Sequence, residues 1–404
     1  MLISAFDSAG QRCSALRVLC LQEEAADRVL TMLKGAMAEL VVGNPDRLAT
    51  DVGPVISAEA RAGIEKHVAA LRAKGRKIEE LALPAATKQG FFVLPTLIEL
   101  DSFTELTREV FGPVLHVVRY RRDRLDQLLD EINAAGYGLT FGVHTRIDET
   151  IVRVTEKIGA GNIYVNRNLI GAVVGVQPFG GHGLSGTGPK AGGPLYLGRL
   201  LAARPAGPAP DGIAGVPPAV AETYRAWLAA EGRVQEATRC QRYLATSLAG
   251  AVKDLAGPVG ERNTYVIQPR GTIACLAQTE AGLLLQIGAA LATGNKALVQ
   301  AMPVSKPILA KLPKTLKGWV SSAEDWTAAG PIAAVLFEGD SDALKSVNQQ
   351  AAALAGPIMP VYGIDRDALA DGIEDYPLEW LVAERSISTN TAAAGGNASL
   401  MTIG

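Results

Sequence analysis

A cysteine close to the start of the chain is the residue best suited to chemistry. Cys13 follows Arg12, precedes Ser14 and lies three positions after Gly10. A neighbouring cation favours the thiolate form of cysteine, which is the nucleophile in covalent catalysis, and glycine lets the backbone approach a ligand closely. The alternative is a buried structural thiol, since free cysteines are among the most buried residue types. The short motif alone favours this alternative, so the rest of the sequence has to decide.

The densest glycine run of the chain covers residues 171–194. Such a run is too rich in glycine for the interior of a helix or strand. A flexible linker is one interpretation, but Phe179, Leu184 and Lys190 are poor linker residues. An ordered loop with exposed backbone N–H groups fits better, because successive N–H groups form a concave site for a carboxylate or phosphate. The run therefore predicts an anion-binding loop.

The composition indicates a globular protein of two domains. Its 404 residues exceed one ordinary domain, and 48% hydrophobic with 20% charged residues allow sizeable cores. A net charge of −2 without a basic stripe argues against nucleic-acid partners and anionic membranes. The sequence has no apolar run of membrane-spanning length and no signal-peptide pattern. We expect a cytoplasmic protein with neither a nucleic-acid partner nor a membrane-spanning segment.

The thiols and imidazoles show no metal-binding spacing. They are scattered along the chain: Cys13, Cys20, Cys240, Cys275, His67, His116, His144 and His182. Scattered cysteines fit reduced thiols in a cytosolic protein. We therefore assign no metal site, and no role to any histidine. The cysteine motif begins almost at Met1, and we therefore expect the chain to be a segment of a longer protein.

Apolar, β-prone runs alternate with runs of helical spacing, which predicts an α/β fold with a largely parallel sheet. In the first part we expect strands at 14–21, 90–100 (a pair interrupted by Pro95), 114–120, 137–145 and 161–166, and helices at 23–40, 57–71, 125–135 and 148–158. Residues 204–218 are rich in Pro and Gly and form the best domain boundary. Beyond it we expect helices at 219–230, 234–255 and 280–291, and strands at 265–276 (two, joined by a turn), 296–299 and 332–337.

Four motifs occur in the order found in the aldehyde dehydrogenase superfamily, and the chain resembles that family. They are Gly10-Gln11-Arg12-Cys13, the loop from Gly43-Asn44-Pro45 to Gly53-Pro54, Glu109-Val110-Phe111-Gly112-Pro113, and Pro178-Phe179-Gly180-Gly181. A chance match of all four is remote. The resemblance implies a parallel-sheet α/β catalytic domain in which Cys13 attacks an aldehyde and its backbone N–H contributes to the oxyanion site.

The same resemblance implies roles for the residues around the motifs. Arg12 and Ser14, with the N–H groups of Gly192 and Gly193, would hold the α-carboxylate of the substrate. Glu109 would bind the hydroxyls of the nicotinamide ribose with Phe111 packing nearby. Without the resemblance, Glu109 reads as a solvated surface acid.

Residues 161–200 resemble the L-glutamate γ-semialdehyde (Δ1-pyrroline-5-carboxylate) dehydrogenases fused to a proline dehydrogenase, and residues 390–404 resemble the C-terminal motif of the longer fused forms. This implies oxidation of the semialdehyde to L-glutamate with NAD. The family's NAD-binding domain, its catalytic glutamate and its oxyanion-site asparagine precede the cysteine motif and are not in this sequence, nor is the FAD-binding proline dehydrogenase. We therefore expect the chain by itself to be inactive as a dehydrogenase.

The second part of the chain resembles the cofactor-binding domain of the same superfamily in a degenerate, Rossmann-like form. It has the strand, the long apolar helix and the Gly294-Asn295 strand entry, but lacks the later glycine-rich phosphate turn. The expected organisation is a thiol domain at 1–203, a linker at 204–218, the degenerate domain at 219–389 and a tail motif at 390–404. We expect this second domain to have a structural role without binding NAD.

Two other functions remain open. One is a structural or assembly module that covers the active site or a substrate tunnel, or that associates with itself. The other is a thiol hydrolase, for which the sequence offers no typical Cys–His spacing.

Overall fold

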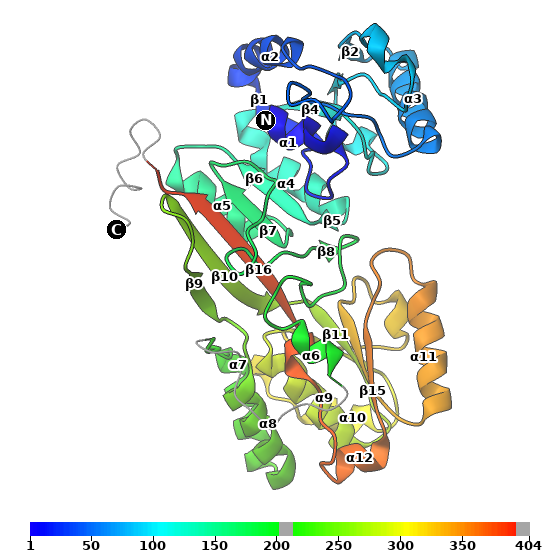
Figure 1. The fold of residues 1–404 in the computed structure, drawn as a ribbon. Coiled ribbons are helices and arrows are strands. Elements are labelled where there is room, and N and C mark those ends of the chain that lie inside the picture. The colour runs from blue at the N-terminus through cyan, green and yellow to red at the C-terminus, as the bar shows by residue number, and fades with distance from the viewer. Residues whose placement is uncertain (202–212, 393–404) are drawn as a thin grey trace. The chain divides into compact units, whose positions relative to one another are not determined.

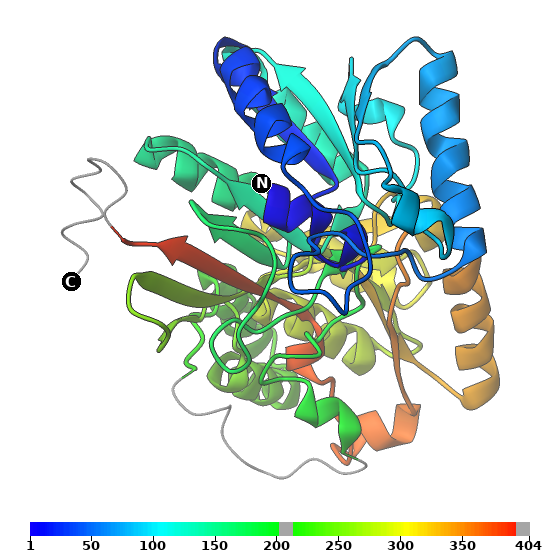
Figure 2. The ribbon, with the colours of Figure 1, turned by 45° about the horizontal axis from the view of Figure 1, so that its top comes forward.

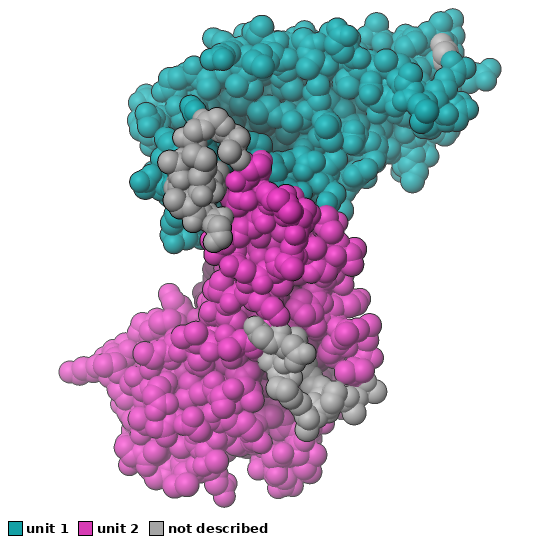
Figure 3. Space-filling model, turned by 60° about the vertical axis from the view of Figure 1, so that its left-hand side comes forward, with its two compact units in different colours: residues 1–159, 163–171 teal, residues 160–162, 172–404 magenta. Residues whose placement is uncertain are grey.

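The computed structural model describes residues 1–201 and 213–392 (Figure 1). Within the expected linker, 204–212 lie outside the described residues, as do 393–404 of the expected tail motif. The chain forms two compact units: unit 1 holds Met1–Gly159 and Ile163–Gly171, and unit 2 holds Ala160–Asn162 and Ala172–Gly404 (Figure 3). The expected α/β fold is confirmed, and each unit is described by itself below.

Unit 1 is built on a four-stranded sheet with the order β1-β4-β3-β2. Its strands are β1 (Val18–Gln22), β2 (Lys77–Glu80), β3 (Thr96–Leu100) and β4 (Val114–Tyr120). β4 is the central strand and runs parallel to both β1 and β3, whereas β2 is antiparallel to β3. The expected strand at 14–21 begins only at Val18, because residues before it form a turn in which Ala15 N–H donates to the Arg12 carbonyl at 3.1 Å.

The expected strand pair at 90–100 is wrong. Only β3 forms there, and its antiparallel neighbour is β2, which precedes it in the chain. Pro95 has no N–H to donate to a sheet, and its carbonyl accepts from Leu81 N–H at 3.1 Å just after β2.

The helices of unit 1 follow the spacing of their apolar residues. α2 (Glu23–Ala38) buries Ala26, Leu30, Leu33 and Met37, and α3 (Ala58–Ala73) buries Ile64, Val68 and Leu71. α3 begins where Ser57 Oγ accepts from Ala60 N–H at 3.1 Å, which satisfies a free helix-end donor. These helices share one core with the sheet. The other elements are α1 (Leu2–Phe6), α4 (Leu125–Ala134), α5 (Asp148–Lys157), β5 (Tyr137–Gly138), β6 (Thr140–Val143) and, across the unit division, β7 (Asn162–Val165).

Unit 2 contains a five-stranded, fully parallel sheet of order β13-β12-β11-β14-β15. The strands are β11 (Thr272–Leu276), β12 (Lys296–Gln300), β13 (Val320–Ala323), β14 (Ala334–Glu338) and β15 (Val361–Ile364). The chain enters this sheet at its central strand, β11, adds β12 and β13 on one side, and then adds β14 and β15 on the other. Such an order is that of a Rossmann-like doubly wound sheet. The Rossmann-like second domain expected from the sequence is therefore confirmed in its fold.

Alternate residues of each parallel strand belong to two different cores. Cys275 and Val299 pack with α7 (Ala219–Ala230), α8 (Val234–Thr246) and α9 (Glu280–Ala292). Ala274 and Leu298 pack instead with α11 (Ser341–Ala353). The sheet thus separates α11 from α7, α8 and α9, as Figures 1 and 2 show.

A second, antiparallel group in unit 2 pairs β16 (Val382–Asn390) with β10 (Glu261–Pro269) over nine positions, and β10 with β9 (Val252–Leu255) (Figure 1). The expected helix at 234–255 is wrong beyond Thr246, because Gly250 adopts a left-handed φ of 76° and β9 follows. The short elements are β8 (His182–Gly183), α6 (Leu197–Leu200), α10 (Ser305–Lys311) and α12 (Arg366–Ala370). Over the described residues, no helix is long and apolar enough to span a bilayer.

Candidate active site

The turn that presents Cys13 has an unusual backbone. Ser8, Ala9 and Gly10 have successive φ values of 55°, 52° and 63°, and left-handed backbone is disfavoured for serine and alanine. The turn is tied down where Leu16 N–H donates to the Ser4 carbonyl at 2.7 Å. Cys13 itself is exposed. The structural alternative of a buried thiol is therefore wrong.

Gly10 brings the cysteine motif directly against a motif about a hundred positions later. A Cβ on Gly10 would lie 2.0 Å from the Gly112 carbonyl oxygen. A Cβ on Gly112 would in turn lie 2.4 Å from Ile64 Cδ1 of α3. Position 10 therefore requires glycine, because its neighbour is main chain, whereas at Gly112 the Ile64 side chain would have to shift. The structure thus brings the Glu109–Pro113 motif next to the turn that carries Cys13.

Gln11 attaches a third motif to the same turn. Its Oε1 accepts from Ile56 N–H at 2.8 Å, and its Nε2 donates to the Pro54 carbonyl at 3.4 Å. The Gly53-Pro54 loop is thereby held against the residue that lies two positions before Cys13. Three of the four family motifs consequently meet in unit 1.

Arg17 is a residue of this site that the sequence analysis missed. Its Nη2 donates to the Arg12 carbonyl at 2.9 Å, its Nη1 donates to the Gly10 carbonyl, and its Nε lies 3.4 Å from Glu109 Oε1. Its guanidinium carbon is 4.3 Å from the centre of the Phe111 ring. Burial lowers the pKa of Arg17, while Glu109 and Cys13 oppose that shift. No sequence signal identified it, since one arginine on an apolar strand edge has no recognisable pattern.

Glu109 and Phe111 lie beside the turn that carries Cys13. The Glu109 side chain is 29% exposed and paired with Arg17, so it is not the freely solvated acid that its sequence context alone suggests. Phe111 is 44% exposed. A half-buried carboxylate next to an exposed aromatic ring has the chemistry to accept hydroxyl hydrogen bonds and to cover a sugar or nicotinamide face.

Arg12 and Ser14 flank Cys13 but differ in environment. Arg12 is exposed and its Nε donates to Ser8 Oγ at 2.9 Å. Ser14 is 7% exposed. The exposed guanidinium can reach an anionic group in solvent, whereas Ser14 offers its hydroxyl only from within the packed turn.

The glycine loop that carries Gly192 and Gly193 belongs to unit 2, so its geometry is described apart from that of Cys13. Gly192 N–H donates to the Phe179 carbonyl at 3.1 Å, and Gly193 N–H donates to the Lys190 carbonyl at 2.9 Å. The loop is therefore ordered, but both N–H groups are used within it. A carboxylate would have to compete with these two carbonyl acceptors.

A buried lysine organises that loop. Lys190 is 3% exposed, and its Nζ donates to the carbonyls of Gly161 at 2.6 Å and Pro178 at 2.9 Å, and to Asn162 Oδ1 at 3.0 Å. Its N–H donates to Glu384 Oε2 at 2.6 Å. Burial lowers the pKa of Lys190 to about 7, although the nearby Glu384 acts in the opposite direction. Burial also raises the pKa of Glu384. The sequence had marked Lys190 only as a poor linker residue.

Two histidines of unit 1 contact each other, and of these His116 is buried and His67 is half-buried. His116 Nδ1 lies 3.0 Å from the Arg17 carbonyl, which can only accept, so Nδ1 carries the proton. His116 Nε2 then accepts from His67 Nε2 at 2.8 Å. Burial lowers the pKa of His116 to about 4. Among the described residues, no group of three or more His, Cys, Asp and Glu side chains could hold a metal ion.

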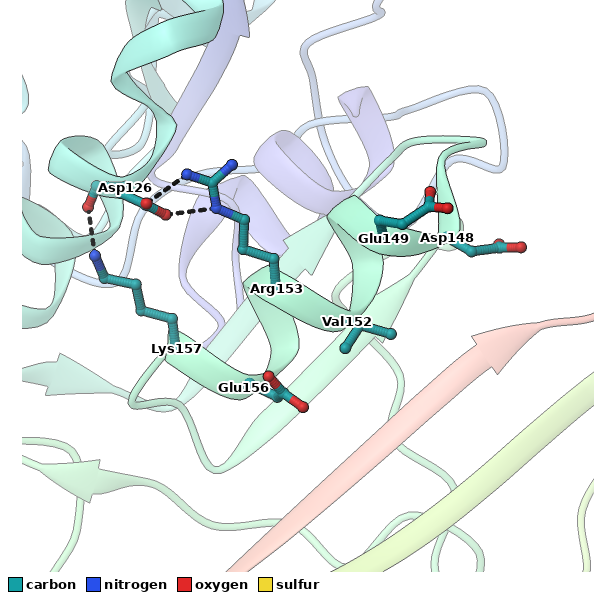
Figure 4. A pocket seen from close by; sticks show the side chains of 7 residues that line it. All are labelled: Asp126, Asp148, Glu149, Val152, Arg153, Glu156 and Lys157. Carbon is teal, nitrogen blue, oxygen red and sulfur yellow. Dashed lines mark hydrogen bonds and ion pairs between the residues drawn. The ribbon is translucent and has the colours of Figure 1, made fainter.

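A shallow pocket of unit 1 lies apart from these motifs, between α4 and α5 (Figure 4). Both of its cations contact Asp126: Arg153 Nε donates to Asp126 Oδ1 at 2.7 Å, and Lys157 Nζ donates to the Asp126 carbonyl at 2.9 Å. None of the predicted site residues lines it.

In unit 2, a carboxylate of the protein fills the position where a Rossmann-like sheet receives its ligand. That position lies at the carboxyl ends of the strands where the order reverses, between β11 and β14. Glu338, 1% exposed, ends β14, and its Oε2 accepts from the N–H groups of Gln278 and Thr279, both at 2.9 Å, at the start of α9. Its Oε1 accepts from Thr279 Oγ1 at 2.6 Å. Two N–H groups that lead into the first turn of α9, where a phosphate would be attracted, are thus already occupied.

Comparison with known proteins agrees with the gathering of motifs around Cys13. The sequence model of the aldehyde dehydrogenase family matches residues 1–203, and the chain belongs to this family. The resemblance stated from the motifs is therefore confirmed.

Among particular proteins, the chain is 52% identical over its whole length to the bifunctional protein PutA of Rhizobium meliloti, of which it covers 33%. It is 35% identical over 199 residues to the 1-pyrroline-5-carboxylate dehydrogenase of Bacillus subtilis, which is 49% of this chain and 38% of that enzyme. The solved structure of proline utilization A (PutA) from Corynebacterium freiburgense matches with a TM-score of 0.67 and 25% identity, over 96% of this chain and 36% of that one. The chain thus spans about a third of the length of the PutA proteins that it matches.

Proposed function

We propose that this chain carries the thiol half of an NAD-dependent aldehyde dehydrogenase that oxidises L-glutamate γ-semialdehyde to L-glutamate within a longer protein. The observation that carries the proposal is that three family motifs pack around one exposed thiol, Cys13. The names of the relatives support the substrate, since they include a 1-pyrroline-5-carboxylate dehydrogenase. On this proposal residues 1–203 are the catalytic domain, 204–218 a linker, 219–389 a degenerate cofactor domain and 390–404 a tail motif.

The chemistry assigned to this chain centres on the sulfur of Cys13. The thiolate adds to the aldehyde carbon and forms a thiohemiacetal, whose oxygen the Cys13 N–H stabilises. NAD, whose ribose Glu109 and Phe111 would hold, would supply the acceptor for the hydride that leaves this carbon. Water then cleaves the resulting thioester, which releases the acid and restores the thiol. Arg12 and Ser14, with Gly192 and Gly193, would hold the α-carboxylate, and Glu109 and Phe111 would hold the ribose. FAD would belong to the proline dehydrogenase of the longer protein.

Acyl transfer to Cys13 tests the nucleophile without a cofactor. We expect p-nitrophenyl acetate to acetylate Cys13, as identified by peptide mass spectrometry. The initial burst of p-nitrophenol should be lost in Cys13→Ala and retained in Cys20→Ala. L-glutamate γ-semialdehyde should protect Cys13 from acetylation better than propanal, which lacks the carboxylate. Acetylation at another residue, or equal protection by the two aldehydes, would contradict the proposal.

A structural role for the second domain is the second candidate, and Glu338 favours it. Its carboxylate holds the N–H groups of Gln278 and Thr279 just before α9, and its negative charge there opposes the binding of a phosphate. We expect calorimetric titration of the chain with NAD to give no binding. An affinity like that of intact dehydrogenases would contradict this. A monodisperse monomer, unchanged by removal of residues 390–404, would argue against self-association.

A further inference from the structure

Ser8 has a backbone conformation that serine rarely adopts. Its φ of 55° lies in the left-handed region, which is disfavoured for serine but open to glycine. Contacts with Gln11 fix this conformation, because the Ser8 carbonyl accepts from Gln11 N–H at 3.0 Å and from Gln11 Nε2 at 3.2 Å. A strained serine at a position that suits glycine points to a use for its side chain.

The hydroxyl of Ser8 contacts the arginine that precedes Cys13. Arg12 Nε donates to Ser8 Oγ at 2.9 Å. Within residues 1–201 and 213–392 this is the only hydrogen bond of the Arg12 side chain, which has no ion pair there. The contact therefore engages Nε and leaves both terminal nitrogens open. Two terminal nitrogens of a guanidinium form the fork that binds a carboxylate through parallel hydrogen bonds.

An exposed arginine without a partner samples many rotamers, and a ligand that binds it has to immobilise it. Arg12 is exposed, but its bond to Ser8 restrains the guanidinium before any ligand arrives. Such preorganisation lowers the entropic cost of binding. Since Arg12 and Cys13 are adjacent and both exposed, a restrained fork holds a carboxylate at a defined place relative to the thiol.

We propose that Ser8 is a positioning residue, which places the guanidinium of Arg12 to receive the carboxylate of the substrate and so favours aldehydes that carry one. This inference rests on the proposed function, which assigns the substrate carboxylate to Arg12. Ser8 touches neither the substrate nor the reacting atoms in this scheme, and it acts only through its hydrogen bond to Arg12.

Alkylation of Cys13 by two reagents of different charge tests this in the full 404-residue chain without any turnover. Iodoacetate carries a carboxylate, and iodoacetamide has a neutral amide in its place. The ratio of their rates at Cys13, followed by peptide mass spectrometry, measures carboxylate recognition, because the state of the thiol affects both rates alike. We expect Arg12→Gln to lower the ratio of iodoacetate to iodoacetamide rates about fourfold, and Ser8→Ala to lower it about twofold.

Further variants separate the placement of Arg12 from a change in the stability of the turn. Ser8→Gly removes the hydroxyl and also relieves the left-handed strain, and it should lower the ratio as Ser8→Ala does. Ser8→Asn keeps an acceptor and tolerates left-handed backbone, so it should stay within about 1.5-fold of the wild type. In the Arg12→Gln background, Ser8→Ala should change nothing further. Arg153→Gln removes an exposed cation of the same unit and should leave the ratio unchanged.

A ratio that Ser8→Ala and Ser8→Gly leave unchanged would overturn the proposal, and so would an equal fall in the Arg12→Gln background. Its failure is distinguishable from failure of the proposed function. If the ratio responds as expected but the semialdehyde protects Cys13 from acetylation no better than propanal, the placement of Arg12 by Ser8 stands and the substrate assignment falls. If the semialdehyde protects better but the ratio ignores Ser8, the substrate assignment stands and Ser8 does not place Arg12.

Discussion

Gly10 and Gly112 touch through their backbones: a Cβ on Gly10 would lie 2.0 Å from the Gly112 carbonyl oxygen. This contact joins the turn before Cys13 to the segment that carries Glu109 and Phe111. No side chain intervenes, so the spacing of the two motifs is set by the main chain itself.

Gly10→Ala should therefore disrupt the turn that carries Cys13. The new Cβ would clash with Gly112, and φ at position 10 is 63°, which alanine disfavours. We expect a loss of at least about 2 kcal/mol in the free energy of unfolding of unit 1, measured by hydrogen exchange, together with a changed alkylation rate of Cys13. Gly35→Ala in α2 is the matched control, because a Cβ there would have no atom within 4 Å. It should increase the free energy of unfolding by roughly 0.5 kcal/mol. Equal effects of the two substitutions would contradict this account.

The stability of unit 1 should depend on the protonation of His116. Burial lowers its pKa from 6.5 to about 4. Between these two pH values the unfolded chain binds a proton at His116, whereas the folded chain does not. The free energy of unfolding should accordingly fall by about 2 kcal/mol on this account as the pH drops from 7 to 5.

His116→Asn keeps a donor toward the Arg17 carbonyl and removes the titrating group. Hydrogen exchange at both pH values measures the loss for each protein, and the variant should lose about 2 kcal/mol less than the wild type. Parallel pH dependences in the two proteins would show that His116 makes no such contribution.

Removal of the Glu338 charge should weaken the second unit. Glu338→Gln places an amide where a carboxylate accepts from Gln278 N–H, Thr279 N–H and the Thr279 hydroxyl. We expect a loss of about 2 kcal/mol in the free energy of unfolding. All four tryptophans lie in unit 2, so tryptophan fluorescence in urea reports on this unit: Trp227, Trp319, Trp326 and Trp380. The exposed Asp342→Asn should stay within about 0.5 kcal/mol of the wild type, and a loss as large as that of Glu338→Gln would refute the role of this carboxylate.

Lys190→Met should loosen the glycine loop more than an exposed lysine substitution of the same kind. It removes a buried donor shared by the Gly161 and Pro178 carbonyls and the Asn162 amide oxygen, which then keep only their bonds from other residues, such as Ser386 N–H to Gly161 and Gly180 N–H to Asn162. We expect a loss of about 3 kcal/mol or more, with faster proteolysis within 171–194. Lys345→Met, at a side chain that is 74% exposed, provides the control. A loop as resistant to protease as that of the wild type would mean that Lys190 does not hold it.

Much of the fold could be predicted because the relevant signals are local. The apolar spacing in α2 and the Ser57 cap of α3 lie within single segments, and so does the alternation of strands and helices that predicts a parallel sheet. The predicted secondary structure was wrong where a segment pairs with a strand that is not its neighbour in the predicted order. Residues 90–95 form no strand because β3 pairs with β2, and residues 252–255 leave the expected helix to pair with β10.

The motifs along the chain already specify the residue types of the site: a thiol preceded by arginine, a later acid with an aromatic residue, and the glycines that permit close contact. The exposure of Cys13, the contact of Gly10 with Gly112 and the pairing of Arg17 with Glu109 became known from the folded structure. It also decided that Gly192 and Gly193 N–H groups are used within their own loop. The physical reason is that burial and ion pairing depend on distances between residues far apart in the chain, whereas motif spacing records only separations along it.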